Sequence, residues 1–312
     1  MIVDRRLLLG SALTSLSACA TGASLGYGVS IETFDVWPGA PPGGEGVTVS
    51  EVIIERATVP GEHDRVVTGV SRPTLTVFRP ANSDGSAVLV IPGGGYRRVV
   101  LDKEGDETAL FLARHGVAAA VLVYRLPGDG WDVGRDAPLQ DAQRALRLLR
   151  SGRLAPGIDG ARVGVIGFSA GGHLAASLAL AGSNGAYDAI DAADAAPARP
   201  DFAALIYAAY LDGKGPPGLQ AGFVGPAPDL MKLVDAKTQP MFLVHAADDA
   251  TVKVGDSVGM YRALKAAGVG AELHVFSEGG HGFGIARARG LPVAVWPQLF
   301  LRWGRARGMF RG

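Results

Sequence analysis

The chain has 312 residues, of which 48% are hydrophobic and 19% charged, a composition typical of a globular protein with one sizeable core. Its 30 basic and 30 acidic residues balance, and no dense basic run follows the N-terminus, which argues against a nucleic-acid partner. The single cysteine excludes an intrachain disulfide.

The first residues have the pattern of an export signal. Arg5 and Arg6 precede an apolar run of about ten residues, which is too short to cross a bilayer because spanning takes roughly 20. Leu-Ser-Ala-Cys at 16–19 resembles the lipobox of bacterial lipoproteins, and the two arginines also resemble a twin-arginine signal. We expect residues 1–18 to be removed and Cys19 to anchor the protein by a lipid in the periplasm or cell envelope. The alternative is an uncleaved apolar helix with a buried free cysteine.

Residues 19–50 are rich in Gly, Pro, Ser and Thr, which predicts a tether followed by an irregular lead-in. A single folded domain is expected over residues 51–312. Val52–Ile54 and Thr74–Phe78 are short strand candidates with no helical segment between them. We therefore expect them to begin a sheet in antiparallel fashion.

From residue 87 onward, strand patterns alternate with helix patterns. The expected strands are apolar runs at 87–91, 117–124, 162–166, 202–208, 240–245 and 271–276. The expected helices lie at 106–115, 139–150, 173–180, 258–267 and 291–305. Within 139–150 the leucines and alanines should face the core, and Arg144, Arg147 and Arg150 should face water. Strands that are apolar on both faces predict an α/β fold with a mostly parallel sheet covered by helices on both sides.

Three less regular stretches, at 125–137, 182–200 and 210–239, follow expected strands or the helix after residue 172. Because such connections gather at one edge of a parallel sheet, we expect them to shape a substrate site there. None is long enough for a full cap domain.

Gly167-Phe168-Ser169-Ala170-Gly171 links an expected buried strand to an alanine- and leucine-rich helix. A G-x-S-x-G match alone is a weak signal in a chain with 45 glycines. Between a strand and a helix, however, it has the context of the nucleophile elbow of α/β-hydrolases, in which a tight turn exposes the serine hydroxyl above the sheet edge. Ser169 is therefore the predicted nucleophile.

A serine hydroxyl needs a base. The candidates are His63, His115, His173, His245, His274 and His281. His281 lies in a glycine-rich loop after the last expected strand, where the base stands when the chain order is serine, acid, histidine. The acid should follow the strand 240–245, where Asp248 and Asp249 both qualify on chemistry. Only one of two adjacent residues in a turn can reach His281.

The loop Pro92-Gly93-Gly94-Gly95-Tyr96 follows the expected strand 87–91. Its glycines allow the backbone to approach a substrate closely, so Gly94 or Gly95 could supply one amide of an oxyanion hole and Ala170 the other. The alternative for this loop is an ordinary tight turn.

Further residues beside these motifs are candidates for shaping the substrate pocket. They are Tyr96, Phe168, His173 and Tyr210. His173 also suits local packing on the helix that follows Ser169.

Several motifs occur together along the chain. They are Pro92-Gly93-Gly94-Gly95-Tyr96, Glu104-Gly105, Tyr124-Arg125-Leu126-Pro127, Pro138-Leu139-Gln140-Asp141-Ala142, Gly167 to Leu174, Arg199-Pro200-Asp201-Phe202 and His281-Gly282-Phe283-Gly284. Together they resemble the bacterial acetylxylan-esterase-like branch of the α/β-hydrolases, whose members are similar to carbohydrate O-acetyl esterases. The resemblance covers residues 35–306 and implies the α/β-hydrolase fold without a large cap domain.

Carried over by position, the resemblance implies Ser169 as nucleophile, Asp249 as acid and His281 as base. The acid loop departs from the pattern in two places. Ala246 stands where a glycine is common, and Lys253 stands where a proline is common.

The sequence thus predicts a serine carboxylic-ester hydrolase that acts through an acyl-enzyme on small esters or acetylated carbohydrates such as xylan fragments. No cluster of His, Cys and carboxylates has metal-ligand spacing, so we expect neither a metal nor a cofactor. One alternative is a prolyl-oligopeptidase-like serine peptidase, for which a propeller-length N-terminal segment would be expected. Another is a non-catalytic binding module with the hydrolase fold, which would lack a triad member.

Overall fold

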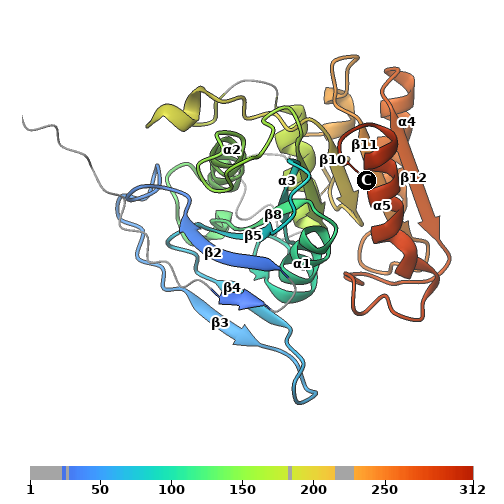
Figure 1. Ribbon diagram of the computed structural model, residues 1–312, viewed down its shortest axis with the longest axis horizontal. Coiled ribbons are helices and arrows are strands. Elements are labelled where there is room, and N and C mark those ends of the chain that lie inside the picture. Colours follow the sequence, from blue (N-terminus) through green and yellow to red (C-terminus); the bar gives the residue numbers. More distant parts are fainter. Residues whose placement is uncertain (1–22, 26–27, 182–184, 215–227, 312) are drawn as a thin grey trace, which may run out of the picture.

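The computed structural model describes residues 23–25, 28–181, 185–214 and 228–311 (Figure 1). The predicted export signal and Cys19 lie outside these residues. In the described part of the chain, no helix has the length and apolar character needed to cross a bilayer.

The described strands form one large mixed sheet of nine strands and one small sheet of three. In spatial order the large sheet consists of β1 (Ala23–Leu25), β2 (Val29–Asp35), β5 (Thr74–Pro80), β8 (Ala118–Val123), β6 (Ala87–Ile91), β9 (Val163–Phe168), β10 (Ala203–Ile206), β11 (Met241–Ala246) and β12 (Ala271–Phe276). In this spatial order, every pair of neighbours from β8 onward to β12 is parallel. The pairs β1–β2, β2–β5 and β5–β8 are antiparallel. The prediction of a mostly parallel sheet is confirmed.

Helices cover both faces of the large sheet (Figure 1). They are α1 (Glu107–Arg114), α2 (Asp136–Arg150), α3 (Ala170–Leu180), α4 (Gly255–Ala266) and α5 (Trp296–Ala306), with short helical turns η1 (Asp102–Asp106), η2 (Pro127–Asp129), η3 (Ala192–Ala195), η5 (Leu230–Leu233) and η6 (Pro292–Val295). Helices α2, α3 and α4 share one apolar core, and α1 and α5 share the other. Strand β6 supplies both cores, because successive side chains of a strand point to opposite faces.

The lead-in expected over residues 19–50 contains a strand, which corrects the predicted start of the folded domain. Strand β2 pairs with β5 over its full length, from Val29 opposite Pro80 to Asp35 opposite Thr74. Val29 is buried in the core under α1 and Ile31 packs against that core. Residues 29–32 alternate between apolar and polar side chains, which indicates a strand. The prediction of an irregular lead-in gave more weight to the Gly- and Pro-rich composition around this segment.

Both short strand candidates form strands, but the expectation that they begin one sheet together is wrong for residues 52–54. Strand β3 (Val52–Glu55) does not enter the large sheet but pairs antiparallel with β4 (Arg65–Thr68), which pairs with β7 (Val99–Val100). The side chains of β3 stay exposed, with Ile53 at 57%. This small sheet lies next to η1, because residue 100 is followed almost directly by Asp102.

The arginines of α2 that were expected to face water bind another segment of the chain instead. Arg144 is buried and pairs with Asp191 at 2.8 Å and with Asp194 at 2.9 Å. Arg147 is also buried and donates to the carbonyl of Ala196 at 3.1 Å. The acidic loop between α3 and β10 thus folds over the polar face of the helix. Helical periodicity cannot reveal this, because it does not show what packs against a polar face.

A fully buried ion pair joins α2 to the segment after β8. Arg125 Nε donates to Asp141 Oδ1 at 2.9 Å, and neither side chain is exposed. The same carboxylate oxygen accepts a hydrogen bond of 2.7 Å from the indole of Trp37, which lies before β5. A buried charge that loses its partner is strongly destabilising, so this pair holds three distant segments together.

We expect Asp141→Asn to lower the free energy of unfolding by about 3–5 kcal/mol, because Arg125 would keep a buried charge without a counter-charge. Urea unfolding followed by circular dichroism measures this change. The matched control is Asp188→Asn at an exposed position, where the change should stay below about 0.5 kcal/mol. Equal effects of the two substitutions would contradict the role given to the pair.

Candidate active site

The turn between β9 and α3 has the geometry expected of a nucleophile elbow. Ser169 stands between the two elements with φ 53° and ψ −119°, a backbone conformation that L-residues rarely adopt. A Cβ at Gly167 would overlap the carbonyl oxygen of Gly171, and a Cβ at Gly171 would overlap that of Ile91. Both glycines are therefore required by close backbone approach, as the motif predicts.

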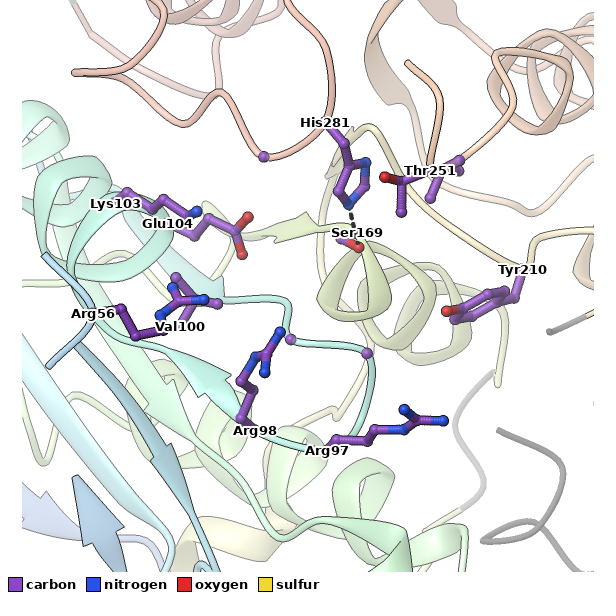
Figure 2. A pocket seen from close by; sticks show the side chains of 14 residues that line it. Arg56, Arg97, Arg98, Val100, Lys103, Glu104, Ser169, Tyr210, Thr251 and His281 are labelled. Carbon is purple, nitrogen blue, oxygen red and sulfur yellow. Dashed lines mark hydrogen bonds between the residues drawn. The ribbon is translucent and has the colours of Figure 1, made fainter. Parts of the chain in front are cut away.

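The structure brings the predicted serine, histidine and acid together. His281 Nε2 lies 3.0 Å from Ser169 Oγ (Figure 2), and His281 Nδ1 lies 2.7 Å from Asp249 Oδ2. The three side chains come from the loops after β12, β9 and β11, which all end at the same edge of the sheet. Parallel pairing produces this convergence, because the carboxyl ends of parallel strands meet at one edge.

Asp249 is held as a carboxylate by several donors. Its Oδ1 accepts hydrogen bonds of 2.8 Å from the amides of Thr251 and Val252. Burial on its own would raise the pKa of this carboxyl, but hydrogen bonds from His245, His281 and the Val252 amide hold the pKa below its ordinary range. The negative charge can therefore fix the proton on Nδ1 of His281, which leaves Nε2 free to accept the serine proton.

Asp248, the other acidic candidate, binds backbone rather than the imidazole. Its Oδ1 accepts from the amide of Gly280 at 2.8 Å, and its Oδ2 accepts from that of Gly279 at 3.3 Å. The carboxylate thus fastens the loop that carries His281. Asp248 thus joins two loops of the site instead of serving as the triad acid.

His245 is a buried support of the acid loop. Its Nδ1 lies 2.8 Å from Ser257 Oγ on α4, and its Nε2 lies 3.0 Å from the carbonyl oxygen of Val252. Both ring nitrogens are therefore engaged with structural partners, and Nε2 also lies 3.4 Å from Asp249 Oδ2. A histidine at the end of a strand gave no sequence signal for this role.

The glycine loop after β6 lies beside the serine. The amide of Gly93 donates to Glu104 Oε2 at 2.7 Å, so it is not available to a substrate. Gly94 and Gly95 line the same pocket as Ser169 and have φ values of 133° and 66°, which favour glycine. Ala170 is the first residue of α3, where an amide has no intrahelical acceptor. These positions are compatible with the oxyanion hole expected from the sequence.

A buried polar network joins the glycine loop to the histidine loop. Glu104 Oε1 accepts from the hydroxyl of Tyr207 at 3.0 Å, and that hydroxyl accepts from the amide of Gly284 at 3.3 Å. The Tyr207 ring also stands edge-on to His281, with 5.0 Å between ring centroids. Burial raises the pKa of Glu104, opposed by the Gly93 hydrogen bond. Sequence reasoning noted Glu104 only within a motif and missed Tyr207, which stands at the end of an ordinary apolar strand.

The pocket in front of Ser169 has a volume of about 450 Å³. Of the side chains proposed to shape it, Tyr210 lines it. Tyr96 and His173 hydrogen-bond to each other at 2.8 Å and line a separate cavity. Burial lowers the pKa of His173 to about 4, so its imidazole is neutral at pH 7.

Phe168 does not reach the pocket, which corrects the prediction made for it. It is fully buried on β9 and packs against Tyr207 and Trp296, with ring centroids 5.8 and 5.9 Å away. The alternation of the strand turns its side chain into the core under α5 while the next residue, Ser169, enters the elbow.

The described residues contain no group of three or more His, Cys, Asp or Glu side chains arranged to hold a metal ion.

Comparison with known proteins agrees with this architecture. The family model BD-FAE matches residues 75–208. An acetylxylan esterase from Xylanibacter ruminicola is 28% identical over 226 residues, which are 68% of this chain and 44% of that protein. Endo-1,4-beta-xylanase B from Butyrivibrio fibrisolvens is 30% identical over 208 residues, which are 64% of this chain and 32% of that protein. The chain spans less than half the length of both relatives.

A solved structure is similar over its whole length. The acetyl ester-xyloside bifunctional hydrolase from Caldicellulosiruptor lactoaceticus has a TM-score of 0.68 and 31% sequence identity, covering 85% of this chain and 100% of that one. The shared fold and the motifs that carry the serine, the acid and the histidine agree with the resemblance seen in the sequence. The chain belongs to the acetylxylan-esterase-like branch of the α/β-hydrolases.

Proposed function

We propose that the protein is a serine carboxylic-ester hydrolase that removes acetyl groups from acetylated carbohydrates such as xylan fragments. The observation that carries this proposal is the continuous hydrogen-bonded path from Ser169 Oγ through His281 to Asp249, with distances of 3.0 and 2.7 Å. A chain of serine, imidazole and carboxylate in this order makes a serine hydroxyl nucleophilic.

In the first half of the reaction, Ser169 Oγ attacks the ester carbonyl carbon and its proton moves to Nε2 of His281. The carbonyl oxygen becomes an oxyanion, which the amides of Ala170 and of Gly94 or Gly95 stabilise. When the tetrahedral intermediate collapses, the bond to the alcohol oxygen breaks. The imidazolium then returns its proton to that oxygen, and the acyl group stays on the serine.

In the second half, a water molecule takes the place of the alcohol. His281 Nε2 accepts a proton from the water as its oxygen attacks the acyl carbon, and returns that proton to Ser169 Oγ when the acid leaves. The Asp249 carboxylate stabilises the imidazolium in both halves. The choice of an acetylated carbohydrate rests on the relatives named as an acetylxylan esterase and as an acetyl ester-xyloside hydrolase.

Ser169→Ala should reduce kcat/KM on 4-nitrophenyl acetate at least about a thousandfold, since removal of a triad nucleophile costs several powers of ten. Folding should survive, because the alanine replaces only a hydroxyl at the pocket surface. Circular dichroism checks the fold. A folded variant that keeps more than about a tenth of the activity would show that Ser169 is not the nucleophile.

Asp249→Asn should lower kcat by ~10⁴, because the amide no longer selects the imidazole tautomer that accepts the serine proton. Asp248→Asn is the matched neighbour. Its remaining amide oxygen can still accept from Gly280, so it should keep most activity and lose at most about 1 kcal/mol of stability. The measurement is kcat of both purified variants on 4-nitrophenyl acetate. Inactivity of the Asp248 variant alone would assign the acid to the other residue.

Acetyl and butyryl esters should exceed octanoyl esters at least about tenfold in kcat/KM, roughly what a few poorly accommodated methylenes cost. The physical reason is that the charged groups of Arg56, Arg97, Arg98 and Lys103 line the pocket, and a long alkyl chain lying against them would strip water from charge without a compensating contact. A series of 4-nitrophenyl esters measures this preference. A rate that rises with chain length would indicate a lipase-like enzyme. Cleavage of peptide anilides in preference to esters would indicate a peptidase.

A further inference from the structure

The pocket in front of Ser169 is strongly cationic. Four basic side chains line it, those of Arg56, Arg97, Arg98 and Lys103, against the single carboxylate of Glu104. Figure 2 shows Arg56, Arg98 and Lys103 on one side of Ser169, while Arg97 extends toward Tyr210. The chain as a whole has no net charge, so this excess is local to the site.

We propose that the substrate of this site carries a carboxylate on its sugar, so that the enzyme deacetylates uronic-acid-containing carbohydrates in preference to neutral ones. This inference rests on the proposed esterase function and names the substrate class for it.

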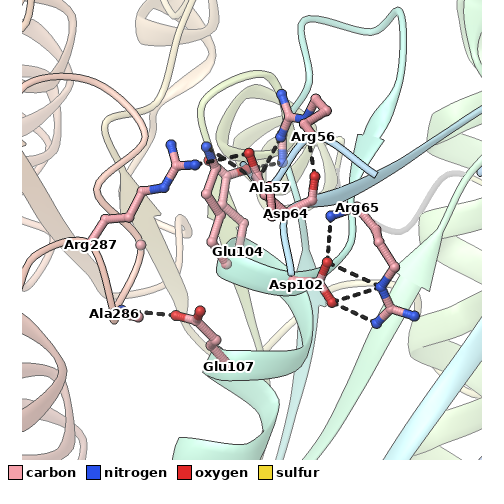
Figure 3. Close-up of polar contacts among 12 residues, drawn as sticks. Arg56, Ala57, Asp64, Arg65, Asp102, Glu104, Glu107, Ala286 and Arg287 are labelled. Carbon is pink, nitrogen blue, oxygen red and sulfur yellow. Dashed lines mark hydrogen bonds and ion pairs between the residues drawn. The ribbon is translucent and has the colours of Figure 1, made fainter. Parts of the chain in front are cut away.

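Two of the four cations already have a protein counter-charge. Arg56 pairs with Asp64 at 2.7 Å, and Lys103 lies 3.8 Å from the same carboxylate. Arg287 also meets Asp64, at 2.9 Å (Figure 3). One carboxylate is thus shared by three cations, which leaves a positive balance at this side of the pocket.

Arg97 and Arg98 have no counter-charge in the described part of the chain. Both side chains are exposed, and the structure places no carboxylate within ion-pair distance of either among these residues. Glu104 cannot serve as their partner, since its two oxygens accept from the Gly93 amide at 2.7 Å and from Tyr207 at 3.0 Å. As far as the described residues go, the guanidinium groups are therefore free to bind an anion from the substrate.

The backbone places these arginines close to the reacting ester. They follow Gly94 and Gly95 with only Tyr96 between, and the amide of Arg97 donates to the carbonyl of Gly94 at 3.2 Å. An anion bound there lies within a few residues of the proposed oxyanion donors. A guanidinium presents paired N–H donors that match a carboxylate, so it binds the carboxylate of a uronate more strongly than a neutral hydroxyl.

The test uses three mono-acetylated methyl glycosides that differ only at carbon 5 of the sugar ring. The xyloside has hydrogen there, the glucoside a hydroxymethyl group and the glucuronoside a carboxylate. Released acetate gives kcat/KM for each. For the wild-type chain at low salt, we expect the glucuronoside to exceed the glucoside about tenfold, the scale of one charge-assisted hydrogen bond. Sodium chloride at about 0.5 M should reduce that ratio by screening.

The variant for this test is the double substitution Arg97→Gln with Arg98→Gln, which should bring the ratio of glucuronoside to glucoside close to one. Arg302→Gln is the matched control, since Arg302 is an exposed arginine of α5 that does not line the pocket. Circular dichroism checks folding. If the double variant does not fold, the salt dependence of the wild-type ratio still tests the proposal.

A wild-type ratio of one or below would overturn the inference, as would a double variant with an unchanged ratio. If a 6-sulfated glucoside is preferred over the neutral glucoside but the glucuronoside is not, the assignment to a uronate is overturned. These outcomes are distinct from failure of the proposed function itself. In that case neither the glycosides nor 4-nitrophenyl acetate would be cleaved, whereas cleavage of neutral esters alone would leave the esterase function intact.

Discussion

The close approach of two backbone segments at the elbow is the constraint on which the site depends. Gly171 on the first turn of α3 lies so near the carbonyl groups of Ile91 and Pro92 that no side chain fits between them. Gly93 is confined in the same way by the carbonyl of Phe168 and the Cβ of Ser169. The serine and the glycine loop are therefore fixed relative to each other by contact of main chain with main chain. This contact also fixes the positions of the amides in the proposed oxyanion hole. Donors that are already in position need not move during the reaction.

Carboxylates extend this rigidity across the site. Glu104 connects the Gly93 amide to Tyr207, and Tyr207 in turn accepts from Gly284 in the histidine loop. The exposed carboxylate of Asp248 binds the same loop through the Gly280 amide. A buried polar group is expensive unless it is fully hydrogen-bonded, so the buried carboxylate of Glu104 strongly favours one arrangement of the loops it joins. These contacts hold the loop that carries His281 in place.

The contrast between Asp249 and Arg98 shows how the site divides its charges. Asp249 is enclosed by donors from its own loop and from two histidines, so its charge is directed at the imidazole. Arg98 is exposed at the rim, where a charge costs little and is open to solvent and ligand. Fixed charge in the interior therefore serves the proposed chemistry, and unpaired charge at the rim is available for recognition.

The sequence by itself determined the central α/β alternation, the elbow at Ser169 and the candidates Asp249 and His281. Apolar runs and a tight glycine turn are local properties, and local properties can be recognised in the amino-acid sequence. The prediction from sequence missed β2, placed β3 in the wrong sheet and wrongly expected Arg144 to face water. Strand pairing and the covering of a helix face depend on segments far away in the chain. The prediction also assigned Phe168 to the pocket, although strand alternation buries that ring. Only the tertiary structure decided that Asp248 fastens the histidine loop, that Glu104 and Tyr207 join two loops, and that four cations gather before the serine. Each of these depends on distances between residues that are remote in sequence, and no periodicity or motif encodes such distances.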